Sequence, residues 1–291
     1  MPHKYFSGCC FSLLLVFSVS CNSSKHAGKS QVTLPGTWQA QAIVIDGDSK
    51  DWPSPYPNYD AKAMVAYATS NDKQNLYITM ETGDEMTQMK ILKQGMIVSI
   101  DTNGKKEPEF NINYPLPNDN EPFDMAKHRS HKGESQLHPE ERWITQIKKS
   151  AKDANQYSLD GFKNCNGGYM VSQTTPCGIK VILKIDEYNE LVWEAVIPFK
   201  AIYNKDTISE KDAGRPVSVC FAVNRFKTPE TKAENNSGMN NTMNANSMQG
   251  PGGRGAPGAS RSGGRNISND PMQHLYENTK TWKQFGLAYQ H

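Results

Sequence analysis

Short apolar runs, many with apolar and polar residues in alternation, dominate the chain from residue 38 onward. Alternation of this kind sends successive side chains to opposite faces of a strand. Turn-forming pairs such as Asn103-Gly104 separate the runs and favour hairpins. We therefore expect strands over residues 38–45, 61–69, 76–82, 95–101, 179–185, 191–197, 216–226 and 281–288.

Two segments carry a helical pattern instead. Residues 84–92 begin with Asp84, whose side chain suits a helix N-cap. Residues 138–151 have a proline in the first turn and place Trp143 and Ile147 on one face. Many short strands and two short helices predict a mainly β domain over residues 38–291, a single antiparallel β-sandwich with short helical insertions.

Residues 233–270 interrupt this pattern with a run rich in asparagine, glycine and methionine. Almost none of these side chains could fill a core, so we expect a disordered low-complexity segment. Because an apolar strand pattern resumes after it, the segment is a long disordered loop before the last strand rather than a tail. The entropic cost of closing a loop grows slowly with length, so the domain tolerates it.

The N-terminal segment has a different character. His3 and Lys4 precede an apolar run over residues 9–19, which ends in small residues before Cys21. A cationic start, a short apolar centre and small residues predict a signal peptide over residues 1–20. The run is too short for a stable anchor, which needs about 20 apolar residues.

The residues before Cys21 resemble the lipobox of bacterial lipoproteins, in a relaxed form similar to that of Bacteroidota. The resemblance implies a chain that begins at a lipidated Cys21, with residues 21–37 as a tether and acyl chains, palmitate among them, as the membrane anchor. The outer membrane is the expected location, and the periplasmic and surface faces both stay open. The alternative is ordinary cleavage nearby, with Cys21 a free thiol.

Charge and motifs narrow the function. The chain has 32 basic and 30 acidic residues, and loss of residues 1–20 removes one lysine and no acid. A nearly neutral chain argues against a nucleic-acid partner, which needs a clustered basic face. No nucleophile elbow, phosphate loop or His-Glu-x-x-His motif occurs in the sequence, so we expect no enzymatic activity.

The cysteines after Cys21 fit an oxidising compartment. Cys220 lies in an apolar strand pattern and is expected to be a small buried residue. Cys165 and Cys177 flank a Gly-Gly segment and are candidates for a disulfide that closes a short loop. The alternative is a pair of free thiols.

Several motifs, in this order, resemble the family-nine carbohydrate-binding modules and the wider group of DOMON-like sandwiches. They are Ile45-Asp46-Gly47-Asp48-Ser49-Lys50-Asp51-Trp52, Ala66-Tyr67, Asn75-Leu76-Tyr77-Ile78-Thr79, Met96-Ile97-Val98-Ser99-Ile100-Asp101, Leu191-Val192-Trp193-Glu194-Ala195-Val196-Ile197-Pro198-Phe199 and Phe285-Gly286. The resemblance spans residues 38–226 and 280–288. It implies a sandwich, sugar binding through paired tryptophans in some members, calcium in some modules and haem in some DOMON-like domains.

The tryptophans of this chain do not match the paired arrangement. Trp38, Trp52, Trp193 and Trp282 lie in strand or turn motifs, so we expect all four in the core. Trp143 lies in a helical insertion and is the candidate ligand-binding aromatic. The alternative is that Trp143 packs on the core with its helix face.

Two groups of residues have weak metal-ligand patterns. Asp46, Asp48 and Asp51 resemble half a calcium loop, and calcium is therefore a possible cofactor. The alternative is that they form a turn and its cap. His128 and His131 have a spacing that suits a transition metal, although neighbouring cations favour a solvated loop.

Together these patterns predict a lipid-anchored envelope protein with a non-catalytic module that binds a glycan. One alternative is a structural or accessory subunit of an envelope complex, with the 233–270 loop contacting a protein partner. Another is a haem- or copper-binding DOMON-like domain, since the loop carries Met239, Met243 and Met248 and thioethers select Cu(I).

Overall fold

The structure is a computed structural model that describes residues 34–117, 139–226 and 273–290. The predicted signal peptide, Cys21, the pair His128 and His131, and the loop 233–270 lie outside these residues. Among the described residues, no helix combines the length and the apolar character needed to cross a bilayer.

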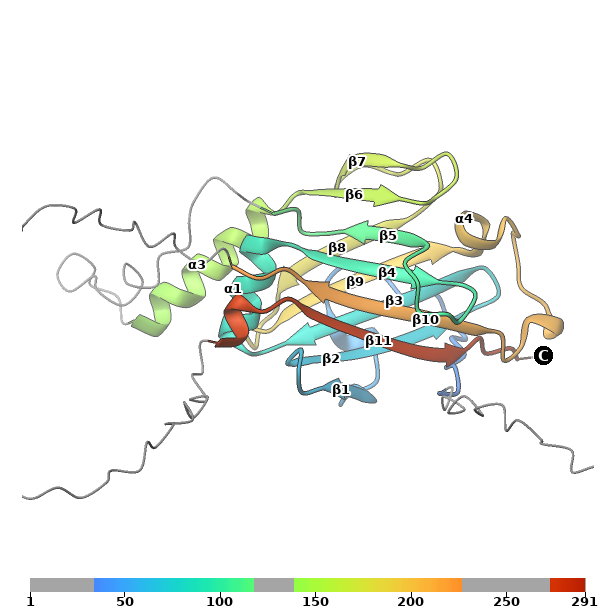
Figure 1. Cartoon of the computed structure of the whole chain (residues 1–291), viewed down its shortest axis with the longest axis horizontal. Helices are drawn as coiled ribbons and strands as arrows, with labels where there is room; N and C mark the ends of the chain where they lie inside the picture. The colour runs from blue at the N-terminus through green and yellow to red at the C-terminus, as the bar shows by residue number, and fades with distance from the viewer. Residues whose placement is uncertain (1–33, 118–138, 227–272, 291) are drawn as a thin grey trace, which may run out of the picture. The chain divides into compact units, whose positions relative to one another are not determined.

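Two antiparallel sheets form a sandwich, which confirms the predicted fold class (Figure 1). Sheet B has the order β1-β2-β3-β9-β8, and sheet A has the order β11-β10-β4-β5-β6-β7. The strands of sheet B are β1 (Asn58–Asp60), β2 (Val65–Asn71), β3 (Asn75–Thr82), β8 (Lys180–Ile185) and β9 (Leu191–Pro198). Those of sheet A are β4 (Met96–Asp101), β5 (Phe110–Asn113), β6 (Gln156–Asp160), β7 (Gly167–Met170), β10 (Pro216–Val223) and β11 (Thr279–Gly286).

The core lies between the sheets because alternate residues of each strand point inward. In β9, Trp193, Ala195 and Ile197 are fully buried in this core, and Glu194 points to the other face, as the alternation predicts. The inward residues of β4, Val98 and Ile100, are also fully buried.

Four predicted strands match the structure to within one residue at each end: 76–82, 95–101, 179–185 and 191–197. The strand predicted over 38–45 is wrong, since this segment forms only an isolated bridge at Trp38. The physical reason is that Ile43 packs against the outer face of sheet B and does not belong to a ladder. Strands β1, β5, β6 and β7 were not predicted.

Both predicted helices are present, as α1 (Glu85–Gln94) and α3 (Pro139–Asp153). Asp84 is the N-cap of α1, and its Oδ1 accepts a hydrogen bond of 2.8 Å from the backbone N–H of Thr87. A further short helix, α4 (Phe199–Tyr203), follows β9, and 3-10 turns are η1 (Ser49–Asp51), η2 (Glu210–Asp212) and η3 (Gln273–Tyr276).

The last two strands pair along their whole length, from Pro216 opposite Gly286 to Val223 opposite Thr279. Buried Lys90 of α1 fixes the chain just before β11. Its Nζ donates hydrogen bonds to the carbonyl of Glu277 and to Oγ1 of Thr279. The C-terminal strand is therefore an integral part of sheet A.

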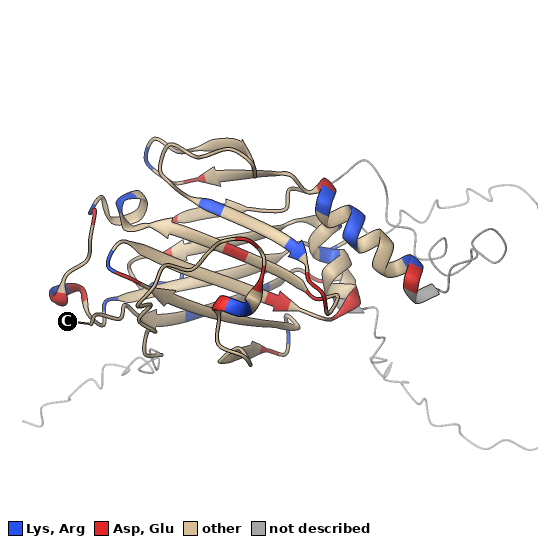
Figure 2. Ribbon diagram, turned by 180° about the vertical axis from the view of Figure 1, so that it is seen from behind, with Lys and Arg blue, Asp and Glu red and all other residues tan. Residues whose placement is uncertain are grey.

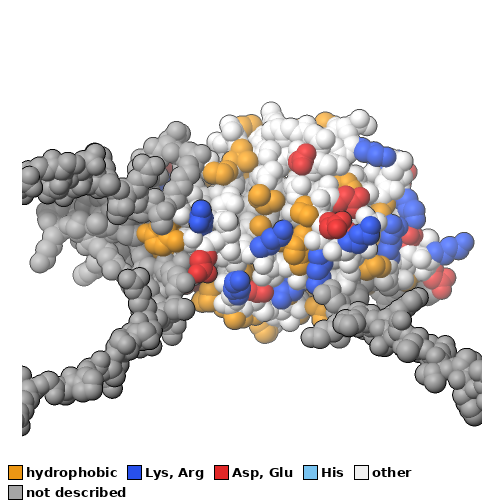
Figure 3. All heavy atoms as spheres, in the orientation of Figure 1, with side chains coloured by type: hydrophobic (Ala, Val, Ile, Leu, Met, Phe, Trp, Pro, Cys, Tyr) orange, Lys and Arg blue, Asp and Glu red, His pale blue; other side chains and the backbone are white. Residues whose placement is uncertain are grey.

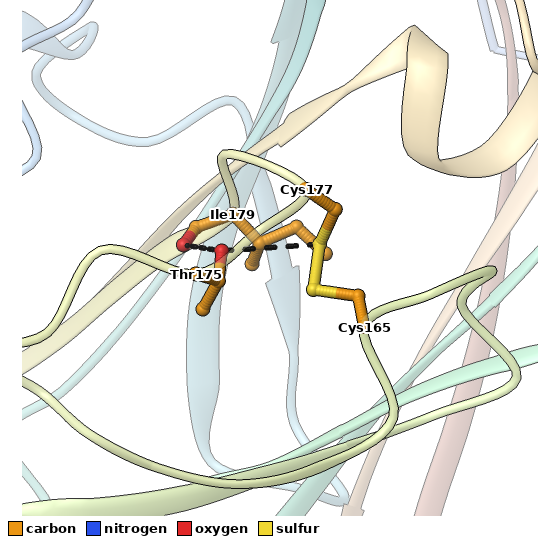
Figure 4. The surroundings of a disulfide bond; sticks show 4 residues. All are labelled: Cys165, Thr175, Cys177 and Ile179. Atoms are coloured by element: carbon orange, nitrogen blue, oxygen red, sulfur yellow. Dashed lines mark hydrogen bonds between the residues drawn. A yellow bond between two sulfur atoms is a disulfide. The ribbon is translucent and has the colours of Figure 1, made fainter.

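A disulfide joins Cys165 and Cys177 (Figure 4). Cys165 lies between β6 and β7, and Cys177 lies between β7 and β8, so the bond closes the loop that contains β7. Buried Thr175 supports this loop by donating a hydrogen bond of 2.8 Å to the carbonyl of Ile179. The link holds the edge of sheet A close to the point where the chain crosses to sheet B.

Candidate functional site

The outer face of sheet B is covered by the chain segment that precedes β1. Ile43 and Trp52 of this segment pack against Ala68 and Tyr77, which point outward from β2 and β3. Tyr56 adds a hydrogen bond of 3.2 Å between its hydroxyl and that of Thr79. This face is therefore a second, smaller core.

Glu194 fixes that covering segment. Its carboxylate is fully buried on the outer face of sheet B and accepts hydrogen bonds from Nε1 of Trp52 (2.7 Å), from the backbone N–H of Gly47 (2.7 Å) and from that of Asp46 (3.2 Å). Burial raises the pKa of Glu194, and the donated hydrogen bonds oppose that rise. Two motifs that are far apart in sequence thus meet in one structural contact.

The outer face of sheet A has a different composition. The strand register places five residues in one row across five strands, perpendicular to the strand direction. In order from β11 to β6 these residues are Trp282, Cys220, Ser99, Asn111 and Asp160. We call this set the polar row. Strands lie about 4.8 Å apart, so the polar row spans about 19 Å.

Hydrogen bonds fix the polar half of the row. Ser99 Oγ donates to Asn111 Oδ1 at 2.7 Å, and Asn111 Nδ2 donates to Asp160 Oδ2 at 3.4 Å. In the neighbouring register position, Asn113 Nδ2 donates to Ser158 Oγ at 3.0 Å. These contacts leave Asp160 Oδ1 and Asn113 Oδ1 without a partner among the described residues, free to accept hydrogen bonds from a ligand.

The other half of the row is aromatic and small. Trp282 is partly exposed, and Nζ of Lys280 lies 5.7 Å from its ring centroid. Cys220, its cross-strand neighbour, is fully buried, as the sequence predicts. Burial raises the pKa of the Cys220 thiol to about 11, so the thiol is protonated at neutral pH and serves as a small neutral residue.

This arrangement suits a ligand with apolar faces and many hydroxyls. An indole ring stacks on an apolar C–H face, and side-chain amides and carboxylates bond hydroxyl groups in fixed directions. Small Cys220 and Ser99 between the two ends leave the ligand room to lie on the sheet. Figure 3 views the molecule from the side of sheet A, where white areas of uncharged polar side chains and backbone lie among scattered apolar and charged side chains.

Trp282 corrects one prediction from the sequence. It was expected in the core, but it points outward because its register partner is Cys220, whereas the inward residues of β10 are Val219 and Phe221. Trp52 and Trp193 are buried, and Trp38 is partly buried in an edge contact with Tyr289.

The candidate from the sequence, Trp143, lies on α3 and is half-buried against the core. Its Nε1 is buried and has no hydrogen-bond partner among the described residues. The structure does not bring Trp143 into the polar row. Its contacts are those of the alternative interpretation, a helix face that packs inward.

The three aspartates predicted as half a calcium loop accept hydrogen bonds from nearby backbone N–H groups. Asp46 accepts from Asp48, Asp48 accepts from Lys50, and Asp51 accepts from Val44. Asp48 is also the N-cap of η1. These are the contacts of a turn and its cap. Within the described ranges, no three His, Cys, Asp or Glu side chains are grouped in a way that could hold a metal ion.

Sequence reasoning missed Asn111, Asp160 and the outward position of Trp282. A signal for the first was present in Phe110-Asn111-Ile112-Asn113, where apolar and amide residues alternate. The run is short, and only the register of its neighbours reveals which residues share a row.

No protein-family model matches the chain, and no curated protein matches it. Among solved structures, it is similar to a carbohydrate binding module family 9 from Caldicellulosiruptor kristjanssonii in complex with glucose. The identity is 12%, the TM-score is 0.29, and the match covers 67% of this chain and 78% of that one. A complex of such a module from the same organism with cellotriose matches at 13% identity and a TM-score of 0.29, over 66% of this chain and 76% of that one. Likeness at this level is no evidence of a shared ligand.

Proposed function

We propose that this chain is a non-catalytic binding protein of the cell envelope that holds a glycan on the outer face of sheet A. The observation that carries the proposal is the polar row, in which Trp282 stands at one end and hydrogen-bonded Asn111 and Asp160 stand at the other. A glycan would lie across the strands, with one sugar ring on the indole and hydroxyl groups of another on the amide and carboxylate.

The membrane anchor is the second part of the proposal, and its support comes from the sequence before Cys21. A lipid on Cys21 would hold the sandwich at the outer membrane through the tether that follows. Metabolic labelling with a palmitate analogue tests this step. Label and membrane association should both be lost in Cys21→Ser, and a labelled Cys21→Ser chain would contradict the anchor.

The glycan site is tested on a glycan array, followed by calorimetric titration with the best-bound oligosaccharide. Trp282→Ala should weaken binding about 5- to 30-fold, because loss of one stacking ring removes about 1–2 kcal/mol. Tyr188→Ala is the matched control, since Tyr188 is an aromatic residue that is 76% exposed in the turn between β8 and β9.

Two outcomes would overturn the glycan site. One is that Trp282→Ala binds as well as the unaltered chain. The other is that no glycan on the array binds, while the chain co-purifies with an envelope complex whether or not Trp282 is changed. The second result would favour a structural or accessory role.

A further inference from the structure

A groove of about 350 Å³ lies between α3 and β8, the edge strand of sheet B. Its lining is largely aliphatic, with Ala151, Val171 and Ile182 among the residues that form it. The volume falls within the range of about 300–1,000 Å³ that is usual for small-molecule sites. The groove is separate from the polar row, which lies on the other sheet.

Three lysines line the same groove. Lys148 and Lys152 lie one turn apart on α3, and Lys184 points outward from β8. Figure 2 shows Lys and Arg positions in blue on α3 and on the strand beside it. None of the described residues that line the groove is an aspartate or a glutamate.

The three ammonium groups are also unpaired within the described part of the chain. None of them forms a hydrogen bond or an ion pair with a described residue, although Lys184 lies close enough to the Asp48 carboxylate to interact with it electrostatically. Lys148 and Lys152, one turn apart on α3, repel each other because no described carboxylate pairs with them, and a bound anion relieves this repulsion. The electrostatics of the groove therefore favour a negatively charged occupant.

The aliphatic stem of Lys184 contacts the segment that covers sheet B. The backbone of Gly47 is packed so closely against the aliphatic stem of Lys184 that a Cβ at Gly47 would lie 2.8 Å from Cδ of the lysine. Gly47 also has a φ of 78°, which glycine adopts without strain. The contact restricts the stem although Lys184 is exposed, so less side-chain entropy is lost when the ammonium group binds a ligand.

A polar group with spare bonding capacity completes the groove. The side-chain amide of Asn155 has no hydrogen-bond partner among the described residues, and it lies just after α3. The hydroxyl of Tyr114 is already used, since it donates to the carbonyl of Ala154 at 2.9 Å. The groove thus offers an aliphatic surface, three cations and one amide.

We propose that this groove binds a small organic anion that carries a carboxylate or phosphate group on an apolar body. The apolar body lies on Val171 and Ile182, and the anionic group lies among the three lysines. The site does not depend on the glycan site, because the two share no residue.

The test uses the full chain with Cys21→Ser, which removes the predicted lipid, and follows amide shifts by NMR during titration. Hexanoate, hexyl phosphate and uncharged hexanamide are the probes. We expect the two anions to shift amides of α3 and β8, and hexanamide to bind at least tenfold more weakly. Comparison of hexanoate with hexyl phosphate identifies the preferred anionic group.

Lys148→Gln with Lys152→Gln should weaken the binding of both anions at least tenfold. Lys149→Gln is the matched control, since Lys149 is exposed on the same helix but does not line the groove. The proposal is overturned if hexanamide binds as tightly as hexanoate, if neither anion shifts α3 and β8, or if the control weakens binding as much as the double variant.

Discussion

The two outer faces of the sandwich use tryptophan in opposite ways. On sheet B, Trp52 is 6% exposed, belongs to a closed apolar cluster and donates its indole N–H to Glu194. On sheet A, Trp282 is partly exposed and is outside both core clusters among the described residues. The first tryptophan stabilises the fold, and the second is available to a ligand.

The difference comes from what lies above each sheet. The segment before β1 crosses sheet B, and Glu194 fixes it there through three donors. On sheet A, the residues of the row beside Trp282 are small or polar, so the row has little apolar surface that must be covered. An outer face can therefore become a binding surface when its side chains are small or polar and some of their oxygen atoms stay free to bond a ligand.

Replacement of the tryptophan on each face by alanine tests the difference between the two faces most directly. Trp52→Ala removes a buried ring and leaves Glu194 without one donor, so it should lower the free energy of unfolding by about 3–5 kcal/mol. Trp282→Ala should lower it by about 1 kcal/mol or less. Urea unfolding of both variants measures the two values, and equal losses would contradict the distinction between the faces.

Glu194 gives the next largest effect. Glu194→Ala leaves the N–H groups of Trp52, Gly47 and Asp46 unpaired, and we expect a loss of about 3 kcal/mol in the free energy of unfolding. Glu187→Ala is the control, because Glu187 is exposed in the nearby turn and should change stability by less than about 0.5 kcal/mol. A Glu194→Ala chain as stable as the control would show that the contact does not fix the covering segment.

Much of the fold could be predicted from the sequence because the central strands have long, regular patterns. Residues 76–82 and 191–197 alternate over enough positions to define both the strand and its inward face. Edge strands such as β6 and β7 are short and polar, so their pattern is weak. Segment 38–45 was misassigned because apolar residues that cover a sheet resemble those that form one.

The site was harder to predict than the fold. The polar row is assembled from β4, β5, β6, β10 and β11, and its members are as much as 183 positions apart in sequence, as Ser99 and Trp282 are. A local pattern does not state which strands become neighbours, and a shift of one residue in register would turn every member of a strand to the other face. Trp143 attracted attention because it stood alone in an insertion, although its helix face packs inward.

A pH-dependent effect on sheet B sharpens the comparison further. Burial, together with a hydrogen bond and charge repulsion from Glu190, raises the pKa of Glu81 to about 7 from its usual 4.5. The folded chain therefore holds this proton more tightly than the unfolded chain. The stabilisation of the folded state by protonated Glu81 is complete below pH 4.5 and is lost as the pH rises through 7. Since Glu81 is partly exposed, the loss should be about 1–2 kcal/mol.

Glu81→Gln should reduce that loss, because the amide is neutral throughout this pH range. Urea unfolding of both chains at pH 5 and pH 8 gives the measurement. The unaltered chain should lose more stability between the two pH values than the variant. Equal pH dependence would show that Glu81 and Glu190 are not coupled in the folded chain.

Ser99→Ala should give the smallest effect on sheet A. Ser99 is buried beneath the expected ligand position, and its hydroxyl holds Asn111 through a hydrogen bond of 2.7 Å. We expect a loss of about 0.5–1 kcal/mol in stability and a glycan affinity reduced a few-fold, because the Asn111 amide is free to rotate. Ser99→Thr, which keeps the hydroxyl, should retain more of the affinity than Ser99→Ala. If the two variants bind equally, the row acts through Trp282 alone, and the hydrogen bonds of its polar half serve only the sheet.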